Sequence, residues 1–293
     1  KENIISLNLE GIEGIDITES RQLLQYFVER LQPRGMNYIF IDEVQQVEHF
    51  EKAVDALYVQ ENCDVYMTGS NSKLLSGELA TLLSGRYVEI RMHPLSFSEF
   101  VSAHPGKSLE RLYQQYLTKS SFPYASMLDQ SRDIRQYLSG IYDTVILKDI
   151  IGRRKMVNQA LLKKITRFLF DNIGNPCSAK KIADTLASMG SKTTIPTVEN
   201  YLGALQDAFL FYRADRYDLK GKEYLKTGGK YYAVDLGLRQ MVLGNKPMDA
   251  GHMLENVVYL ELLRRYDEVY IGKVGTAEID FVAVRDGEPC YYQ

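Results

Sequence analysis

Short apolar runs alternate with helix-period segments over the first hundred residues of the chain. One run, residues 38–41, contains four apolar residues and ends abruptly in two acids, Asp42 and Glu43. A continuous apolar run of this length predicts a strand buried on both faces, as in parallel α/β sheets. Residues 48–60 then carry apolar positions at helical spacing, and a second strand is predicted at 64–68. Strand, helix and strand in this order predict a βαβ unit. Further elements expected here are a strand at 3–9, helices at 18–31 and 72–83, and a strand at 87–92.

The pattern is mainly helical from residue 108 to residue 170, and a linker with Gly174 and Pro176 follows. Beyond it, two predicted helices precede two predicted strands, which is the winged-helix order of helix, turn, helix and β-hairpin. These elements are expected at 178–187, 196–208, 209–216 and 231–234, and a helix at 251–266 and three short strands come after them. The predicted domains are residues 1–105, 106–171, 172–248 and 249–293.

Composition excludes several classes of protein. An apolar content of 45% with 25% charged residues is ordinary for a soluble globular protein. A net charge of −3 argues against a general electrostatic affinity for nucleic acid. The three cysteines are widely spaced and odd in number, which favours a reducing cytoplasm over a disulfide framework or a zinc site. No apolar run approaches ~18 residues, so we expect no membrane span.

The two acids after the central run have two interpretations. Ligands of parallel α/β sheets gather at the carboxyl ends of the strands, where Asp42 and Glu43 would lie. Two acids there suit a Walker B pair, in which the first holds Mg²⁺ and the second orients or activates a water. The alternative is an acidic helix N-terminus that follows a strand and has no chemical role.

Four motifs in a fixed order make the first interpretation more specific. They are FIDEVQ at 40–45, TGSNSKLL at 68–75, LSGRYVEI at 83–90 and PLSFSEF at 94–100. Through essentially its whole length the chain resembles the bacterial and archaeal AAA+ ATPases that carry a C-terminal restriction-endonuclease-like domain. The resemblance implies an α/β fold with a parallel-sheet P-loop NTPase core, a helical lid subdomain, a winged helix and an α/β nuclease-like domain. It also implies ATP and Mg²⁺ as ligands.

The resemblance assigns roles to several residues of the first domain. Asp42 would coordinate Mg²⁺, and Glu43 would polarise the attacking water. Ser70 or Asn71 would be the polar sensor of the γ-phosphate, although a plain turn explains these residue types equally well. Arg86 fits an arginine finger supplied to a neighbouring subunit of a homo-oligomer, with a salt-bridged arginine as the alternative.

The Walker A loop that such ATPases need for phosphate binding is missing. No G-x-x-x-x-G-K-[ST] motif occurs in the 293 residues, and the nearest match, at residues 106–108, lacks the first glycine. The loop would precede the strand at 3–9. The chain also lacks an initiator Met and ends abruptly, so we expect part of a longer protein that, as given, binds ATP weakly or not at all.

The resemblance also predicts a metal site in the last domain. Glu255 matches the helix acid of the PD-(D/E)xK nucleases and Asp280 matches their strand acid, both as Mg²⁺ ligands. Gln293 stands where a third acid is expected, and an amide is a weaker Mg²⁺ ligand than a carboxylate. The set is therefore incomplete, and a degenerate domain that docks DNA or a partner is the favoured alternative to an active nuclease.

The expected DNA contact is a basic hairpin or the more basic helical stretch at 148–167. The second helix of the winged unit, 193–209, contains no Lys or Arg, which makes it a poor surface for phosphate. The basic side chains of the hairpin are Arg213, Arg216, Lys220, Lys222, Lys226 and Lys230. A solvated charged face, or a winged helix that holds another protein, explains the same residues. Three functions follow: an ATPase coupled to DNA or a partner, a Mg²⁺-dependent nuclease regulated by the ATPase half, or a non-catalytic binding regulator.

Overall fold

The computed structural model describes residues 3–69, 83, 86–152, 158–218, 223–244, 249–274 and 277–293. The chain forms two compact units, Lys1–Ile90 and Arg91–Gln293, and each is treated by itself. Within the described residues, no helix combines the length and the apolar character that crossing a membrane requires. The domain limits expected at 105, 171 and 248 stay predictions.

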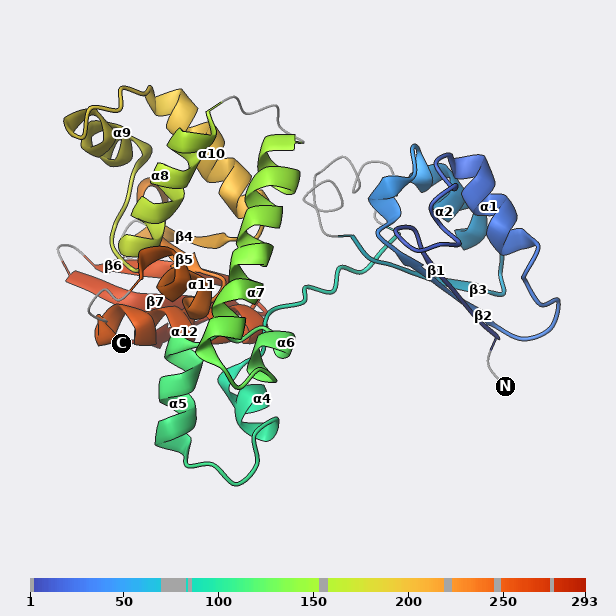
Figure 1. Cartoon of the computed structure of the whole chain (residues 1–293), viewed down its shortest axis with the longest axis horizontal. Coiled ribbons are helices and arrows are strands. Elements are labelled where there is room, and N and C mark those ends of the chain that lie inside the picture. Colours follow the sequence, from blue (N-terminus) through green and yellow to red (C-terminus); the bar gives the residue numbers. More distant parts are fainter. Residues whose placement is uncertain are drawn as a thin grey trace. The chain divides into compact units, whose positions relative to one another are not determined.

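The first unit is a small α/β fold with two layers, a sheet and the helices that cover it (Figure 1). Its three strands form an all-parallel sheet in the order β1-β2-β3. The elements are β1 (Asn3–Asn8), α1 (Ser20–Val28), β2 (Asn37–Asp42), the 3₁₀ turn η1 (Val44–Gln46), α2 (Phe50–Tyr58) and β3 (Cys63–Met67). The strands expected at 3–9 and 64–68, the central strand and the helices expected at 18–31 and 48–60 are confirmed, with ends shifted by a few residues.

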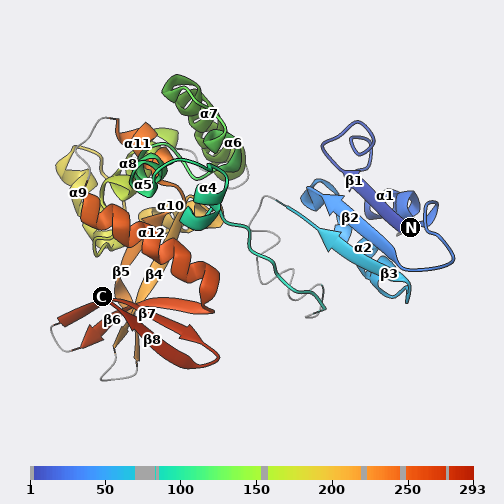
Figure 2. The ribbon, with the colours of Figure 1, turned by 90° about the horizontal axis from the view of Figure 1, so that it is seen from below.

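Both helices cover the same face of this sheet. Two successive right-handed crossovers that move in one direction across a sheet place their helices on one side, as Figures 1 and 2 show. The buried core between the layers includes Leu23, Phe27, Ile39, Ile41 and Leu57.

The opposite face of the sheet is open in the described part of the chain. Phe40 and Tyr66 lie side by side there, 40% and 42% exposed, with their rings stacked at 4.9 Å. The expectation that the central strand is buried on both faces is therefore wrong. Burial alternates along β2 because no described element covers its second face.

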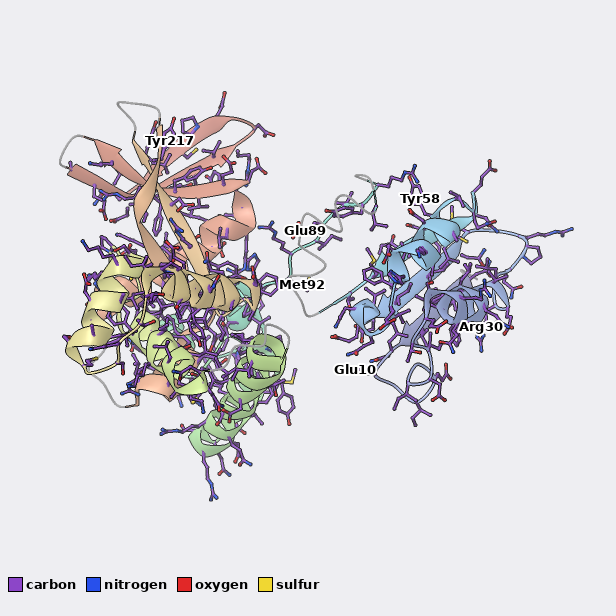
Figure 3. The ribbon with its side chains drawn as sticks, turned by 90° about the horizontal axis from the view of Figure 1, so that it is seen from above. Glu10, Arg30, Tyr58, Glu89, Met92 and Tyr217 are labelled. Carbon is purple, nitrogen blue, oxygen red and sulfur yellow. The ribbon has the colours of Figure 1, made fainter. Side chains whose placement is uncertain are left out.

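The strand expected at residues 87–92 is also absent. Residues 86–92 form no regular structure, and Val88 and Met92 are almost fully exposed. Alternating apolar side chains cannot make a strand without a neighbour, and no described strand pairs with this segment. Figure 3 labels Glu89 and Met92 within it. Most of the helix expected at 72–83 lies outside the described residues.

The second unit is a helical layer joined to a sheet of five strands. Its helices are α4 (Phe97–Ser102), α5 (Leu109–Thr118), α6 (Pro123–Ser126), α7 (Ser131–Thr144), the π-helical η2 (Val145–Gly152), α8 (Gln159–Asp171), α9 (Ala179–Ser188), α10 (Ile195–Asp207), α11 (Leu236–Leu243) and α12 (Ala250–Arg265). Its strands are β4 (Phe211–Asp218), β5 (Glu223–Ala233), β6 (Glu268–Val274), β7 (Ala277–Arg285) and β8 (Glu288–Tyr292). The helices expected at 178–187, 196–208 and 251–266 are confirmed.

One sheet joins the predicted hairpin to the last strands of the chain. Its order is β5-β4-β6-β7-β8, so β4 pairs antiparallel with β5 and parallel with β6. Helix α12 packs on this sheet through Tyr259 and Leu260, which share a core with Ile271 and Phe281 (Figure 2). The sheet thus combines strands that precede residue 248 with strands that follow it, and the domain limit predicted there stays a prediction.

One buried carboxylate fixes α11 to the segment between α5 and α6. Asp235 caps α11 by accepting from the backbone N–H of Leu238 at 2.8 Å. Its other oxygen accepts from the backbone N–H of Ser121 at 2.7 Å and from the Ser120 hydroxyl at 3.1 Å. Gly237 allows this contact, because its Cα faces the Lys119 carbonyl with no room for a side chain. Helix α11 is therefore held against the 119–121 segment by backbone fit as well as by hydrogen bonds.

The cysteines give a simple test of this packing. Cys177 is buried and burial raises the pKa of its thiol to about 11, whereas Cys290 is exposed. At pH 8 a pKa of 11 leaves about one thiol in a thousand as the reactive thiolate. We expect iodoacetamide to modify Cys290 first and Cys177 only when the second unit unfolds. Mass spectrometry of timed samples measures this order, and equally fast labelling of both thiols in the native protein would contradict it.

Candidate functional site

The carboxyl ends of β1, β2 and β3 form one polar edge in the first unit. Asp42 is the last residue of β2, and its carboxylate accepts a short hydrogen bond from the Thr68 hydroxyl just beyond β3. Thr68 is held in turn by the bond from its N–H to the Ile41 carbonyl, 2.8 Å. Asn8 stands beside Asp42 in register on β1. The sheet therefore brings three oxygen-bearing side chains to the edge where α/β proteins bind ligands.

Glu43 follows in an unusual backbone conformation. Its φ of 58° and ψ of 44° lie in the left-handed region, which costs a residue with a Cβ about 1–3 kcal/mol. The turn is fixed on both sides, because the Glu43 N–H points to the Thr68 hydroxyl at 3.4 Å and the Val44 N–H donates to the Thr68 carbonyl at 3.1 Å. The Glu43 carboxylate accepts a short bond from the Gln45 amide. A strained backbone conformation that the surrounding structure holds in place is common at functional sites. No residue pattern in the sequence predicted this conformation at Glu43.

A second polar group extends the edge. The Glu10 carboxylate accepts from the Gln46 amide at 2.9 Å, and the Glu10 N–H donates to the Asn8 side chain at 2.8 Å. Asn8, Glu10 and Thr68 were not among the predicted site residues. Their only signal in the sequence is their position at or just beyond the carboxyl ends of β1 and β3.

The other predicted residues of this site lie elsewhere. Ser70 and Asn71 fall outside the described residues. Arg86 lies against α2, with its guanidinium 3.9 Å from the Asp55 carboxylate and over the Tyr58 ring. Figure 3 labels Tyr58 well apart from Glu10, which belongs to the carboxyl edge. The structure thus places Thr68 against both the Asp42 carboxylate and the Glu43 backbone, and it places Arg86 against α2.

The predicted metal ligands of the second unit meet at one cluster. Glu255 on α12 and Glu278 on β7 both pair with Lys230 of β5, at 2.9 Å and 2.7 Å. Burial raises the pKa of Asp280, and the negative charge of Glu255 raises it further. The Asp280 N–H donates to the Gln293 side chain at 3.2 Å. Among the described residues, no group of three or more His, Cys, Asp or Glu side chains has the arrangement of a metal site.

The predicted DNA-binding residues do not form one basic surface among the described residues, and some of them form ion pairs within the chain. Arg213 pairs with Asp215 on the same strand at 2.8 Å, and Arg216 lies against Gly228 of β5. Lys220 and Lys222 fall outside the described residues. Lys230, expected on the basic face of the hairpin, is instead buried in the acidic cluster. β4 lies between two strands of the sheet and does not form a free two-stranded wing.

Comparison with known proteins agrees with the fold of the first unit. Residues 1–101 match the family model of an AAA domain, and residues 110–249 match that of a domain of unknown function, DUF8612. The Walker-type ATPase of Pyrococcus abyssi is a solved structure with a TM-score of 0.52 to this chain, covering 82% of it and 84% of that chain. At 13% sequence identity this likeness shows the fold alone.

Two relatives align over nearly the whole chain. An uncharacterized protein of Methanocaldococcus jannaschii is 28% identical over 96% of this chain and 66% of its own length. An uncharacterized protein of Haemophilus influenzae is 43% identical over 100% of this chain and 74% of its own length. The chain therefore spans about two thirds to three quarters of these relatives. It belongs to the same family as the Haemophilus influenzae protein, and its residues 1–101 match the AAA domain.

Proposed function

We propose that the first unit hydrolyses ATP in a longer protein, and that the second unit transmits the nucleotide state to DNA or to a partner protein. The observation that carries this proposal is the carboxyl edge of the sheet, where Asp42 and Glu43 follow one another and Thr68 holds Asp42. A sheet edge that presents fixed acids and hydroxyls suits phosphoryl transfer, which needs positioning and charge neutralisation more than covalent chemistry.

Asp42 is the residue we assign to Mg²⁺. Carboxylate, hydroxyl and amide oxygens are ligands that this hard cation prefers, and Asp42, Thr68 and Asn8 supply one of each. The bound ion would supply positive charge against the phosphate oxygens. Glu43 would orient the attacking water and accept its proton, and its left-handed backbone follows directly on Asp42 at the carboxyl end of β2.

The remaining parts of the ATP site come from outside this edge. We assign phosphate binding to a glycine-rich loop beyond the 293 residues, and the greater length of both relatives supports this. Ser70 or Asn71 remains the proposed γ-phosphate sensor. Arg86 would act on a neighbouring copy of the chain, and the half-exposed guanidinium, distant from its own carboxyl edge, suits such a role.

The second unit is proposed to bind DNA or a partner protein without cleaving DNA. Helices α9 and α10 followed by β4 and β5 have the order of a winged helix, and Arg213 with Arg216 remain candidates for DNA contact. A protein partner is the alternative, because α10 carries no basic residue. Binding measured over a salt series separates the two, since phosphate contacts weaken steeply as salt rises.

Nucleotide binding tests the proposed site. We expect a longer chain that includes the upstream loop to bind a fluorescent ATP analogue with Mg²⁺, and Asp42→Asn to weaken that binding by about tenfold through loss of one charge at the metal. Asp64→Asn is the matched control, because Asp64 lies on the same sheet face near the start of β3, away from the carboxyl edge, and accepts from the Tyr66 hydroxyl at 2.9 Å. Equal affinity of both variants would remove Asp42 from the site.

A further inference from the structure

A buried lysine lies inside the acidic cluster of the second unit. Lys230 is only 4% exposed, and its ammonium contacts Glu255 of α12 and Glu278 of β7 within 3 Å. Burial lowers the pKa of Lys230, but its hydrogen bonds to the two carboxylates outweigh burial and raise the pKa overall. One permanent positive charge therefore links β5, α12 and β7.

The Glu255 carboxylate is already surrounded by protein donors. Its Oε1 accepts from Lys230 and from the Tyr232 hydroxyl at 2.6 Å. Its Oε2 lies 3.5 Å from His252 Nδ1. The backbone covers this oxygen as well, since a Cβ on Gly174 would come within 3.1 Å of it. Both carboxylate oxygens of Glu255, the predicted metal ligand on the helix, thus already contact protein side chains.

The cluster does not fit the divalent metal that the nuclease resemblance implies. A hard divalent cation needs several oxygens at about 2.0–2.6 Å, and it is repelled by an ammonium at close range. Asp280 could offer a carboxylate, but Glu255 and Glu278 face Lys230, and the Gln293 amide oxygen accepts from the Asp280 N–H. The lysine occupies the position in which the acids would share a metal.

We propose that Lys230 is an internal counter-ion that takes the place of a divalent cation in this cluster and excludes metal from it. The carboxylates of Glu255 and Glu278 then fix α12 and β7 to β5 and do not activate water. This inference concerns the second unit only, and it holds or fails independently of ATP hydrolysis by the first.

Electron paramagnetic resonance of Mn²⁺, added alone to the 293-residue chain, tests the inference. We expect any Mn²⁺ bound by the wild-type chain to be unaffected by Asp280→Asn. Lys230→Met leaves Glu255, Glu278 and Asp280 without their counter-ion. It should therefore bind one Mn²⁺ at least about tenfold more tightly than the wild type, and adding Asp280→Asn should remove that site. Lys180→Met, which removes one charge from the exposed side of α9, is the matched control and should bind as the wild type does.

Two results would overturn the proposal. One is a Mn²⁺ ion bound by the wild-type chain and lost in Asp280→Asn, because the cluster would then hold metal in the presence of Lys230. The other is a Lys230→Met variant with native circular dichroism and no gain in Mn²⁺ affinity. The first comparison leaves position 230 unchanged, so it decides the matter even where the Lys230→Met variant does not fold.

Discussion

Glu43→Gln should slow ATP turnover by about 100-fold or more in the longer protein that carries the phosphate-binding loop. The amide keeps the size of the side chain and adopts the same left-handed backbone, but it cannot accept a proton from the attacking water. Since Asp42 is unchanged, Mg²⁺ and ATP should still bind, and the variant should trap unhydrolysed nucleotide. Phosphate release and retained radiolabelled ATP, measured on the same samples, test both parts.

Glu61→Gln is the control for this substitution. Glu61 follows α2, is exposed, and lies before β3, at the opposite end of the strand from Thr68. It should turn over ATP at the wild-type rate. Wild-type turnover by Glu43→Gln would instead exclude Glu43 from the chemistry, while loss of ATP binding in that variant would assign it a binding role.

Gly237→Ala should destabilise the second unit by roughly 3 kcal/mol or more, an overpacking cost combined with lost buried hydrogen bonds. A Cβ at this position would lie 1.9 Å from the Lys119 carbonyl oxygen and 2.8 Å from the Ser120 Cα. Both are backbone atoms, so no side chain can rotate away. Helix α11 must shift, and the bonds of Asp235 to Ser120 and Ser121 must then lengthen.

Gly140→Ala is a matched control in another helix. A Cβ at Gly140 on α7 meets nothing within 4 Å, and alanine in a helix interior should stabilise the unit by up to about 1 kcal/mol. For a unit of this size, 3 kcal/mol corresponds to a fall in Tm of roughly 6–12 °C. Calorimetry distinguishes the two variants by the sign of the change. A Tm for Gly237→Ala within a degree of the wild type would show that the 119–121 segment yields easily.

Local pattern was sufficient for most elements of the fold. The strand before Asp42, the helices α1, α2, α9, α10 and α12, and the strands after α12 all follow from spacing along the chain. The pairing of β4 with β6 does not follow from spacing, because a parallel partner more than fifty residues away leaves no periodic signal in the sequence. The strand expected at 87–92 failed for the same reason, since alternation says nothing about whether a partner exists.

The candidate site shows the same division. Asp42 and Glu43 could be placed at the carboxyl edge because an apolar run ends there, whereas Thr68 became relevant only through its contact with Asp42. Lys230 was grouped with basic hairpin residues that differ from it only in what surrounds them. Its neighbours Glu255 and Glu278 lie 25 and 48 positions further along the chain, so only the folded structure could identify it as an ion-pair residue.

The ladder from β4 to β6 has a mechanical consequence. Hydrogen bonds in the middle of a sheet resist shear, and here α12 also spans strands on both sides of that ladder. The β4–β5 hairpin and the strands β6–β8 therefore cannot rotate against each other unless the hydrogen bonds between β4 and β6 break. If ATP turnover generates motion, this five-stranded sheet and α12 should move as a single rigid body, and any hinge should lie outside them.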